Sequence, residues 1–118
     1  MPFNNPSRIA ATAIVSVALL AAFAAPSARA ADNSPQLRFQ AGAVEPASLT
    51  LPANTAVKLQ VTNSGDSAVE FESFELHRER VVQPGQTITV YLPALPPGTY
   101  PFFDDFSHGA VKGQIVSR

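Results

Sequence analysis

Apolar and polar residues alternate in short runs along most of the chain from Gln36 onward. Gln36–Gln40 and Val57–Thr62 carry an apolar residue at every second position, which is typical of a strand with one face in a core. Turn residues such as Asn63-Ser64-Gly65-Asp66 and Pro96-Pro97-Gly98 interrupt these runs roughly every ten positions. The pattern predicts an all-β domain of about seven or eight strands, packed as an antiparallel sandwich or barrel.

The other expected strands are separated by turn residues in the same way. They cover residues 45–51 after a bend, 68–72, 80–82, 87–92, 99–102 and 113–117. No segment carries a helical period over ten residues, although residues 76–80 have room for a single helical turn.

The first thirty residues have the pattern of a secretory signal peptide. A polar start with Arg8 precedes an apolar run over residues 9–25, and Ala28 and Ala30 form an A-x-A cleavage pattern. An uncleaved N-terminal anchor is the alternative. We therefore expect a signal peptide at 1–30, a flexible leader at 31–35, a β-domain at 36–118 and a periplasmic location.

Charge and sulfur content narrow the function classes. Losing Arg8 and Arg29 lowers the Lys and Arg count from 8 to 6 against 9 acidic residues, which leaves a net charge of −3. This net negative charge argues against binding to nucleic acid and to an anionic membrane surface. The sequence after the expected cleavage site has no second long apolar stretch, so we do not expect the cleaved protein to insert into a membrane. The chain has no cysteine and its one methionine is Met1, so the exported part has no soft metal ligand.

Two acidic groups are candidates for chemistry. Glu70 and Glu72 lie two positions apart on an expected strand, so both side chains leave the face opposite Val69 and Phe71, roughly 7 Å apart. Like charges this close raise carboxylate pKa values unless a cation lies between them. A solvated face on an edge strand is the alternative.

The second group lies in a loop rich in aromatic residues. It contains Asp104, Asp105 and His108 among three phenylalanines, Phe102, Phe103 and Phe106. The loop is either a plug for one end of the sandwich, with its acids in water, or an acidic pocket roofed by aromatic rings.

Several segments in order resemble the small cupredoxin-like domain of EfeO type, a family that accompanies exported bacterial iron-uptake systems. The segments are residues 45–53, 61–63, 69–73, 79–85 and 95–104. The resemblance implies a Greek-key sandwich with a metal pocket at one end, between the strand of Glu70 and the loop of Asp104. Electron-transfer cupredoxins need a Cys thiolate, two His and usually a Met, so a blue-copper site is excluded.

The resemblance implies an oxygen-rich metal site for an iron or copper ion. Its expected ligands are Glu45, Glu70, Glu72, Asp104 and Asp105, with His77 or His108 as a nitrogen donor. Glu75 and Glu79 are assigned to the surface.

The leading hypothesis is an exported metal-binding protein, a periplasmic accessory of ferrous-iron uptake. It would pass its ion to a periplasmic iron-binding protein or a membrane iron permease, and it is not expected to be an enzyme beyond assisting iron oxidation. The alternative is a metal-free docking module that binds an iron-transport partner through the loop of Phe102, Phe103 and Phe106.

Overall fold

The computed structural model describes residues 2–3, 18, 21–22, 24–25 and 33–118, and the chain divides into two units, 1–30 and 31–118. Most of the expected signal peptide lies outside the described residues, and it stays a prediction. Within the described residues, no helix has the length and apolar character needed to cross a membrane.

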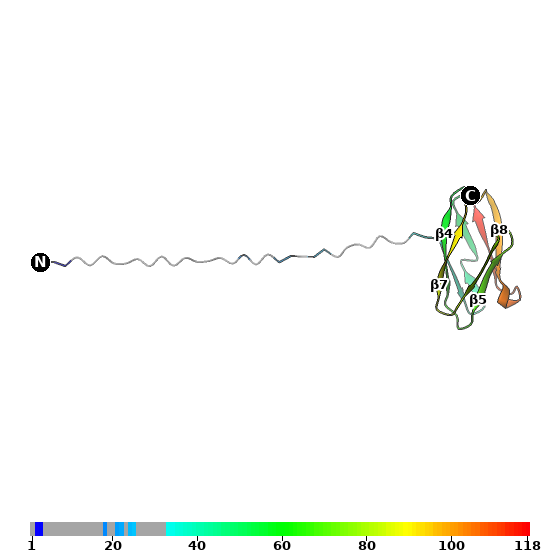
Figure 1. The fold of residues 1–118 in the computed structure, drawn as a ribbon, viewed down its shortest axis with the longest axis horizontal. Helices are drawn as coiled ribbons and strands as arrows, with labels where there is room; N and C mark the ends of the chain where they lie inside the picture. Colours follow the sequence, from blue (N-terminus) through cyan, green and yellow to red (C-terminus); the bar gives the residue numbers. More distant parts are fainter. Residues whose placement is uncertain (1, 4–17, 19–20, 23, 26–32) are drawn as a thin grey trace. The chain divides into compact units, whose positions relative to one another are not determined.

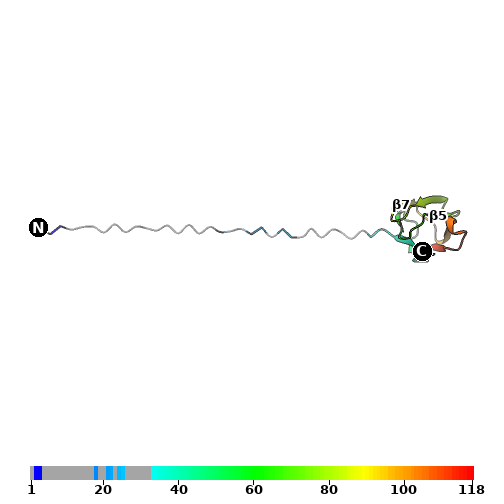
Figure 2. The ribbon, with the colours of Figure 1, turned by 90° about the horizontal axis from the view of Figure 1, so that it is seen from below.

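The second unit is a sandwich of two β-sheets, which confirms the predicted fold class (Figures 1 and 2). The four-stranded sheet has the order β2 (Ala43–Glu45), β1 (Gln36–Gln40), β4 (Val57–Asn63) and β7 (Thr87–Leu92). The five-stranded sheet has the order β3 (Ser48–Leu51), β9 (Lys112–Ser117), β8 (Gly98–Asp104), β5 (Val69–Ser73) and β6 (Arg78–Val82). A 3-10 turn, η1 (Asp105–Ser107), follows β8 directly.

The sheets are mixed, so the expectation of purely antiparallel pairing is wrong. Strand β1 pairs in parallel with β4, and β3 pairs in parallel with β9, whereas the other neighbours are antiparallel. The cause lies in the segment expected as one strand at 45–51. It divides at Pro46 and Ala47 into β2 and β3, which belong to different sheets, so the chain crosses the sandwich there.

Alternating apolar residues of both sheets form the core. Phe71 of β5 and Phe102 of β8 are almost fully buried, with ring centroids 5.2 Å apart, and Phe39 of β1 meets Phe102 edge-on at 6.4 Å. Such aromatic pairs stabilise a core beyond the area that they bury.

Residues 76–80, which have room for a single helical turn in the sequence pattern, do not form one. Strand β6 begins at Arg78, and a turn before it contains His77 with φ of 52°. The Arg78 guanidinium donates to the carbonyl oxygens of Leu76, His77 and, on β7 of the other sheet, Tyr91. These bonds stabilise the extended start of β6 and connect the two sheets at this edge.

Candidate functional site

Three carboxylates converge on the outer face of the five-stranded sheet. Glu70, Glu72 and Asp105 each offer an oxygen, and the three oxygens lie within 4.8 Å of one another. Two come from alternate positions of β5 and the third from η1, 33 positions later. We call these three residues the outer carboxylate cluster.

The strand register explains the convergence. Phe71 lies in the core, so its neighbours Glu70 and Glu72 project away from it. Strand β5 pairs with β8 through Phe71 and Asp104, which brings the start of η1 beside β5. The same register places Glu72 between Phe103 of β8 and Glu79 of β6.

Asp104 points to the other side of the sheet and does not join the outer carboxylate cluster. It is 5% exposed, and its Oδ1 accepts hydrogen bonds from the main-chain N–H groups of Glu70 (2.9 Å) and Phe106 (3.0 Å). Consecutive residues at a strand end project in opposite directions, which separates Asp104 from Asp105. Asp104 thus holds the loop against β5 from inside the sandwich.

Glu70 has a strongly shifted protonation equilibrium. Its pKa is raised to about 7, first by a carboxyl–carboxylate hydrogen bond with Glu79, then by desolvation and by the charges of Glu79, Asp105 and Glu72. The pKa of Glu72 is also raised, mainly by desolvation and then by Asp105 and Glu79. Every charge that acts on these two groups is negative, so the arrangement favours a proton or a cation.

Arg78 of β6 is bound elsewhere and does not neutralise the cluster. The guanidinium of Arg78 donates to main-chain carbonyls, as described above. A surface hollow of about 470 Å³ lies beside the cluster, and its lining includes Glu72, Glu79 and His77. His77 thus faces the same hollow, although it lies outside the group of converging ligand atoms.

The other expected ligands lie apart from the cluster. Glu45 is an exposed residue of β2 in the opposite sheet, in register with Arg38 of β1. His108 is exposed, has φ of 53° and caps η1, with its main-chain N–H donating to the carbonyl of Asp105. The structure therefore brings together three of the seven expected ligands: Glu70, Glu72 and Asp105.

The three phenylalanines of the loop differ in exposure. Phe102 is 1% exposed and belongs to the core, so it is not available as a surface anchor. Phe103 is half-buried and packs on Phe74 with ring centroids 5.4 Å apart, whereas Phe106 is 48% exposed and Phe74 is 67% exposed. The exposed aromatic surface therefore includes Phe74, in the turn after β5, and does not include Phe102.

Sequence reasoning missed the contribution of Glu79, which was assigned to the plain surface. Glu79 lies directly opposite Glu72 across the β5–β6 pair and exerts the largest influence on the pKa of Glu70. The register of the β5–β6 hairpin, which pairs Glu72 with Glu79, would have revealed this neighbour. The sequence pattern left room for a helical turn at 76–80, so this pairing was not predicted.

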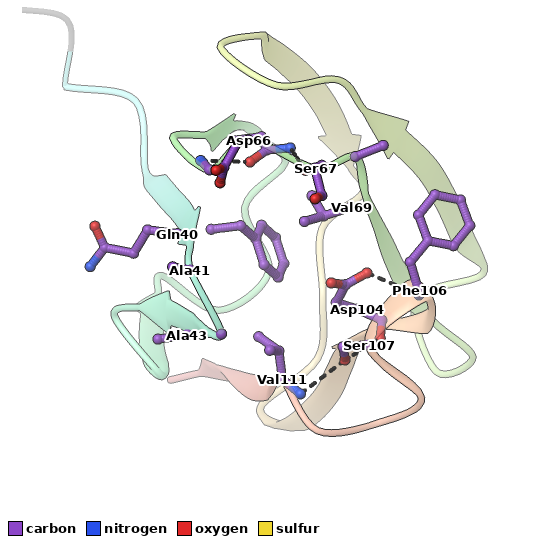
Figure 3. A pocket seen from close by; sticks show the side chains of 15 residues that line it. Gln40, Ala41, Ala43, Asp66, Ser67, Val69, Asp104, Phe106, Ser107 and Val111 are labelled. Atoms are coloured by element: carbon purple, nitrogen blue, oxygen red, sulfur yellow. Dashed lines mark hydrogen bonds between the residues drawn. The ribbon is translucent and has the colours of Figure 1, made fainter.

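A cavity of about 220 Å³ opens to the surface at one end of the sandwich, on the core side of β5, and exposed residues 40–43, 66 and 67 form part of its rim (Figure 3). Its wall includes Asp104, Val69 and Val111, with Asp66 and Ser67 at the far rim (Figure 3). The cavity is separate from the outer carboxylate cluster, because Val69 and Asp104 face it while Glu70 and Asp105 do not line it.

Comparison with solved structures supports the fold. The chain is similar to reduced auracyanin from Roseiflexus castenholzii, with a TM-score of 0.62 and 13% identity, covering 72% of this chain and 96% of that one. It is also similar to a purple cupredoxin from Nitrosopumilus maritimus, with a TM-score of 0.57 and 17% identity, covering 72% of this chain and all of that one. At these identities the likeness concerns the fold alone.

Two sequence comparisons place the chain among relatives. An uncharacterized protein of Rickettsia prowazekii (strain Madrid E) is 39% identical over 66 residues, which span 56% of this chain and 53% of that protein. The chain thus matches only about half the length of this relative. The model of the cupredoxin-like domain matches residues 13–117, which is most of the chain. The chain therefore belongs to the cupredoxin-like domain family.

Proposed function

We propose that this protein binds a divalent cation through its outer carboxylate cluster. The observation that carries the proposal is the convergence of Glu70, Glu72 and Asp105 within 4.8 Å, with only negative charges acting on Glu70. Such a group is unfavourable when fully ionised, and a cation bound between the oxygens removes the repulsion.

The donor set selects among metals. Blue-copper sites require a thiolate and usually a thioether, and the chain has no cysteine and no methionine beyond Met1. Its residues therefore do not fit that centre. Carboxylate oxygens suit hard or borderline ions such as Fe²⁺ and Mn²⁺, and Cu²⁺ less selectively. We propose His77, which lines the same hollow as Glu72, as the imidazole that completes such a shell.

The biological role that we propose is an accessory of ferrous-iron uptake, with the ion as cargo. It rests on the expected export signal and on the resemblance of residues 45–104 to EfeO-type domains. Asp105 is exposed and Glu72 is half-buried, while Glu70 is only 7% exposed. A site that is open on the side of Asp105 favours release of the ion to a periplasmic iron-binding protein or a membrane iron permease. Copper is the second candidate ion.

Calorimetric titration tests the proposal. Anaerobic Fe²⁺, Mn²⁺ and Cu²⁺ are titrated at pH 7.5 into the protein and into the Glu70→Gln/Glu72→Gln variant. We expect binding of one ion per chain that weakens at least tenfold in the variant. Glu45→Gln is the matched control, since Glu45 lies in the opposite sheet and its loss should leave the affinity unchanged. A folded protein without saturable binding of any of the three ions would falsify the proposal.

One observation favours a second function. Phe74 and Phe106 expose large apolar surfaces, and the pair Phe74–Phe103 adjoins the acids. An aromatic surface with an acidic neighbour suits docking to a basic partner. Substitution of Phe74 and Phe106 by Ala should then abolish capture of the partner while leaving cation titrations unchanged.

A further inference from the structure

We propose that the cavity on the core side of β5 binds a small organic cation, of the alkylammonium class, through the carboxylate of Asp104. This site is distinct from the outer carboxylate cluster and takes a different class of ligand. It rests on the geometry of the cavity and not on the proposed cation function.

The first support is the state of the Asp104 carboxylate. Both of its hydrogen bonds, from the N–H groups of Glu70 and Phe106, fall on Oδ1. Among residues 33–118 no donor is bound to Oδ2, and no fully buried side-chain oxygen lacks a partner. Oδ2 is therefore accessible, and Figure 3 shows it turned toward the cavity. A side chain that is 95% buried thus turns a carboxylate oxygen without a protein donor toward the cavity.

The second support is the lack of internal competition for that oxygen. The Ser107 hydroxyl donates to the Asp104 carbonyl and accepts from the N–H of Val111. The Asn63 amide donates to the carbonyls of Ser67 and Val82 and accepts from the N–H of Gly65. None of the described lining residues is Lys, Arg or His, and Asp66 adds a second acid at the rim. The wall therefore complements a positive ligand.

The third support is the apolar character and size of the wall. Phe39, Val69 and Val111 line much of it, whereas the ring of Phe106 points away from the cavity (Figure 3). The face of an aromatic ring such as that of Phe39 attracts cations. At about 220 Å³ the cavity is smaller than the roughly 300–1,000 Å³ of sites for drug-sized ligands. A short alkylammonium ion suits both features, because its head donates to Oδ2 and its chain contacts the apolar wall. A hard divalent ion needs about six oxygen ligands, which this wall does not offer.

The test follows propylammonium chloride by ¹H–¹⁵N correlation NMR, with 1-propanol as the neutral probe and potassium chloride at equal ionic strength. We expect saturable shifts at the amides of Val69, Ser107 and Val111. Binding of 1-propanol should be at least tenfold weaker. Asp104→Asn keeps an oxygen for the two N–H donors and removes the charge, and we expect it to weaken propylammonium binding at least tenfold. Glu72→Gln removes the same charge on the outer face and should leave the affinity unchanged.

The proposal is overturned if no saturable shift occurs, if potassium chloride reproduces the shifts, or if Asp104→Asn binds as tightly as the parent chain. Shifts confined to Glu72 and Glu79 would also overturn it, since they would place the ligand on the outer face. If Asp104→Asn does not fold, Val69→Phe offers an independent variant. The Val69 side chain faces the cavity (Figure 3), so a larger side chain at this position should block propylammonium without any change in charge.

Discussion

The main-chain N–H of Glu70 donates a 2.9 Å hydrogen bond to Oδ1 of Asp104 across 34 positions of sequence. The Glu70 side chain meanwhile belongs to the outer carboxylate cluster, and Asp104 lines the cavity on the core side. One bond between two acidic residues therefore fixes the strand that carries the cluster against the loop that carries Asp105. The two candidate sites share this backbone and no side chain.

Removing this bond should destabilise the fold. Asp104→Ala leaves the N–H groups of Glu70 and Phe106 without their acceptor. We expect a loss of about 2 kcal/mol or more in the free energy of unfolding, because buried unsatisfied donors cost roughly 1–3 kcal/mol. Urea denaturation measures it. Asp104→Asn keeps an acceptor and should lose less than half as much, whereas equal losses would show that the hydrogen bonds are not the cause.

The raised pKa of Glu70 should make stability depend on pH. Its pKa is about 7 in the folded chain against 4.5 for the free side chain, so the folded state binds the proton more tightly than the unfolded state does. Without metal, stability should therefore fall as pH rises from about 4.5 to about 7 and then level off. Denaturation midpoints at pH 5 and pH 8 measure the change.

Glu70→Gln is the control for this pH dependence. Glutamine does not titrate, so the stability of the variant should fall much less between pH 5 and pH 8 than that of the parent chain. At pH 8 the variant should be more stable than the parent chain. A parent chain whose midpoint is equal at the two pH values would contradict the prediction.

Protons and cations should compete at the outer carboxylate cluster. Ligand carboxylates bind metal in their ionised form, and Glu70 ionises around pH 7. We expect Mn²⁺ affinity to rise about tenfold between pH 6 and pH 8, as measured by calorimetry. Asp104→Asn leaves all three ligands in place and should show the same rise, whereas a pH-independent affinity would exclude Glu70 as a ligand.

The space around Gly113 of β9 is too small for a side chain, so a substitution there should destabilise the fold. A Cβ built there would lie 2.5 Å from Cζ of Phe102 and 2.7 Å from the carbonyl oxygen of Ala47. Gly113→Ala should therefore cost about 1–3 kcal/mol in the free energy of unfolding, in the range of overpacked cores. Gly98→Ala is the matched control on β8, because its nearest contact is 3.7 Å, and thermal melts of both variants make the comparison.

Much of the sandwich was predictable because its strands follow simple alternation. Gln36–Gln40 and Val57–Asn63 bury every second residue, as their sequences indicate. The parallel pairs were not predictable, because the separation of β2 from β3 depends on which sheet each strand joins and not on local pattern.

The candidate site was predictable only in part. The shared face of Glu70 and Glu72 follows from a strand period of two. The choice of Asp105 over Asp104 depends on where β8 ends, and the part of Glu79 depends on the register of β5 with β6. The end of β8 and the register of β5 with β6 depend on tertiary pairing, so the local sequence pattern does not predict them.

The parallel pairing of β3 with β9 also has a consequence for kinetics. It joins Ser48 to Gln114, 66 positions apart, and the Gln114 side chain donates to the Ser48 hydroxyl at 3.2 Å. Closing so long a loop loses chain entropy before any contact compensates for it, so this domain should fold over milliseconds to seconds. A chain that is expected to be exported would stay unfolded, and thus competent for translocation, for longer than a fast-folding helical bundle of equal length.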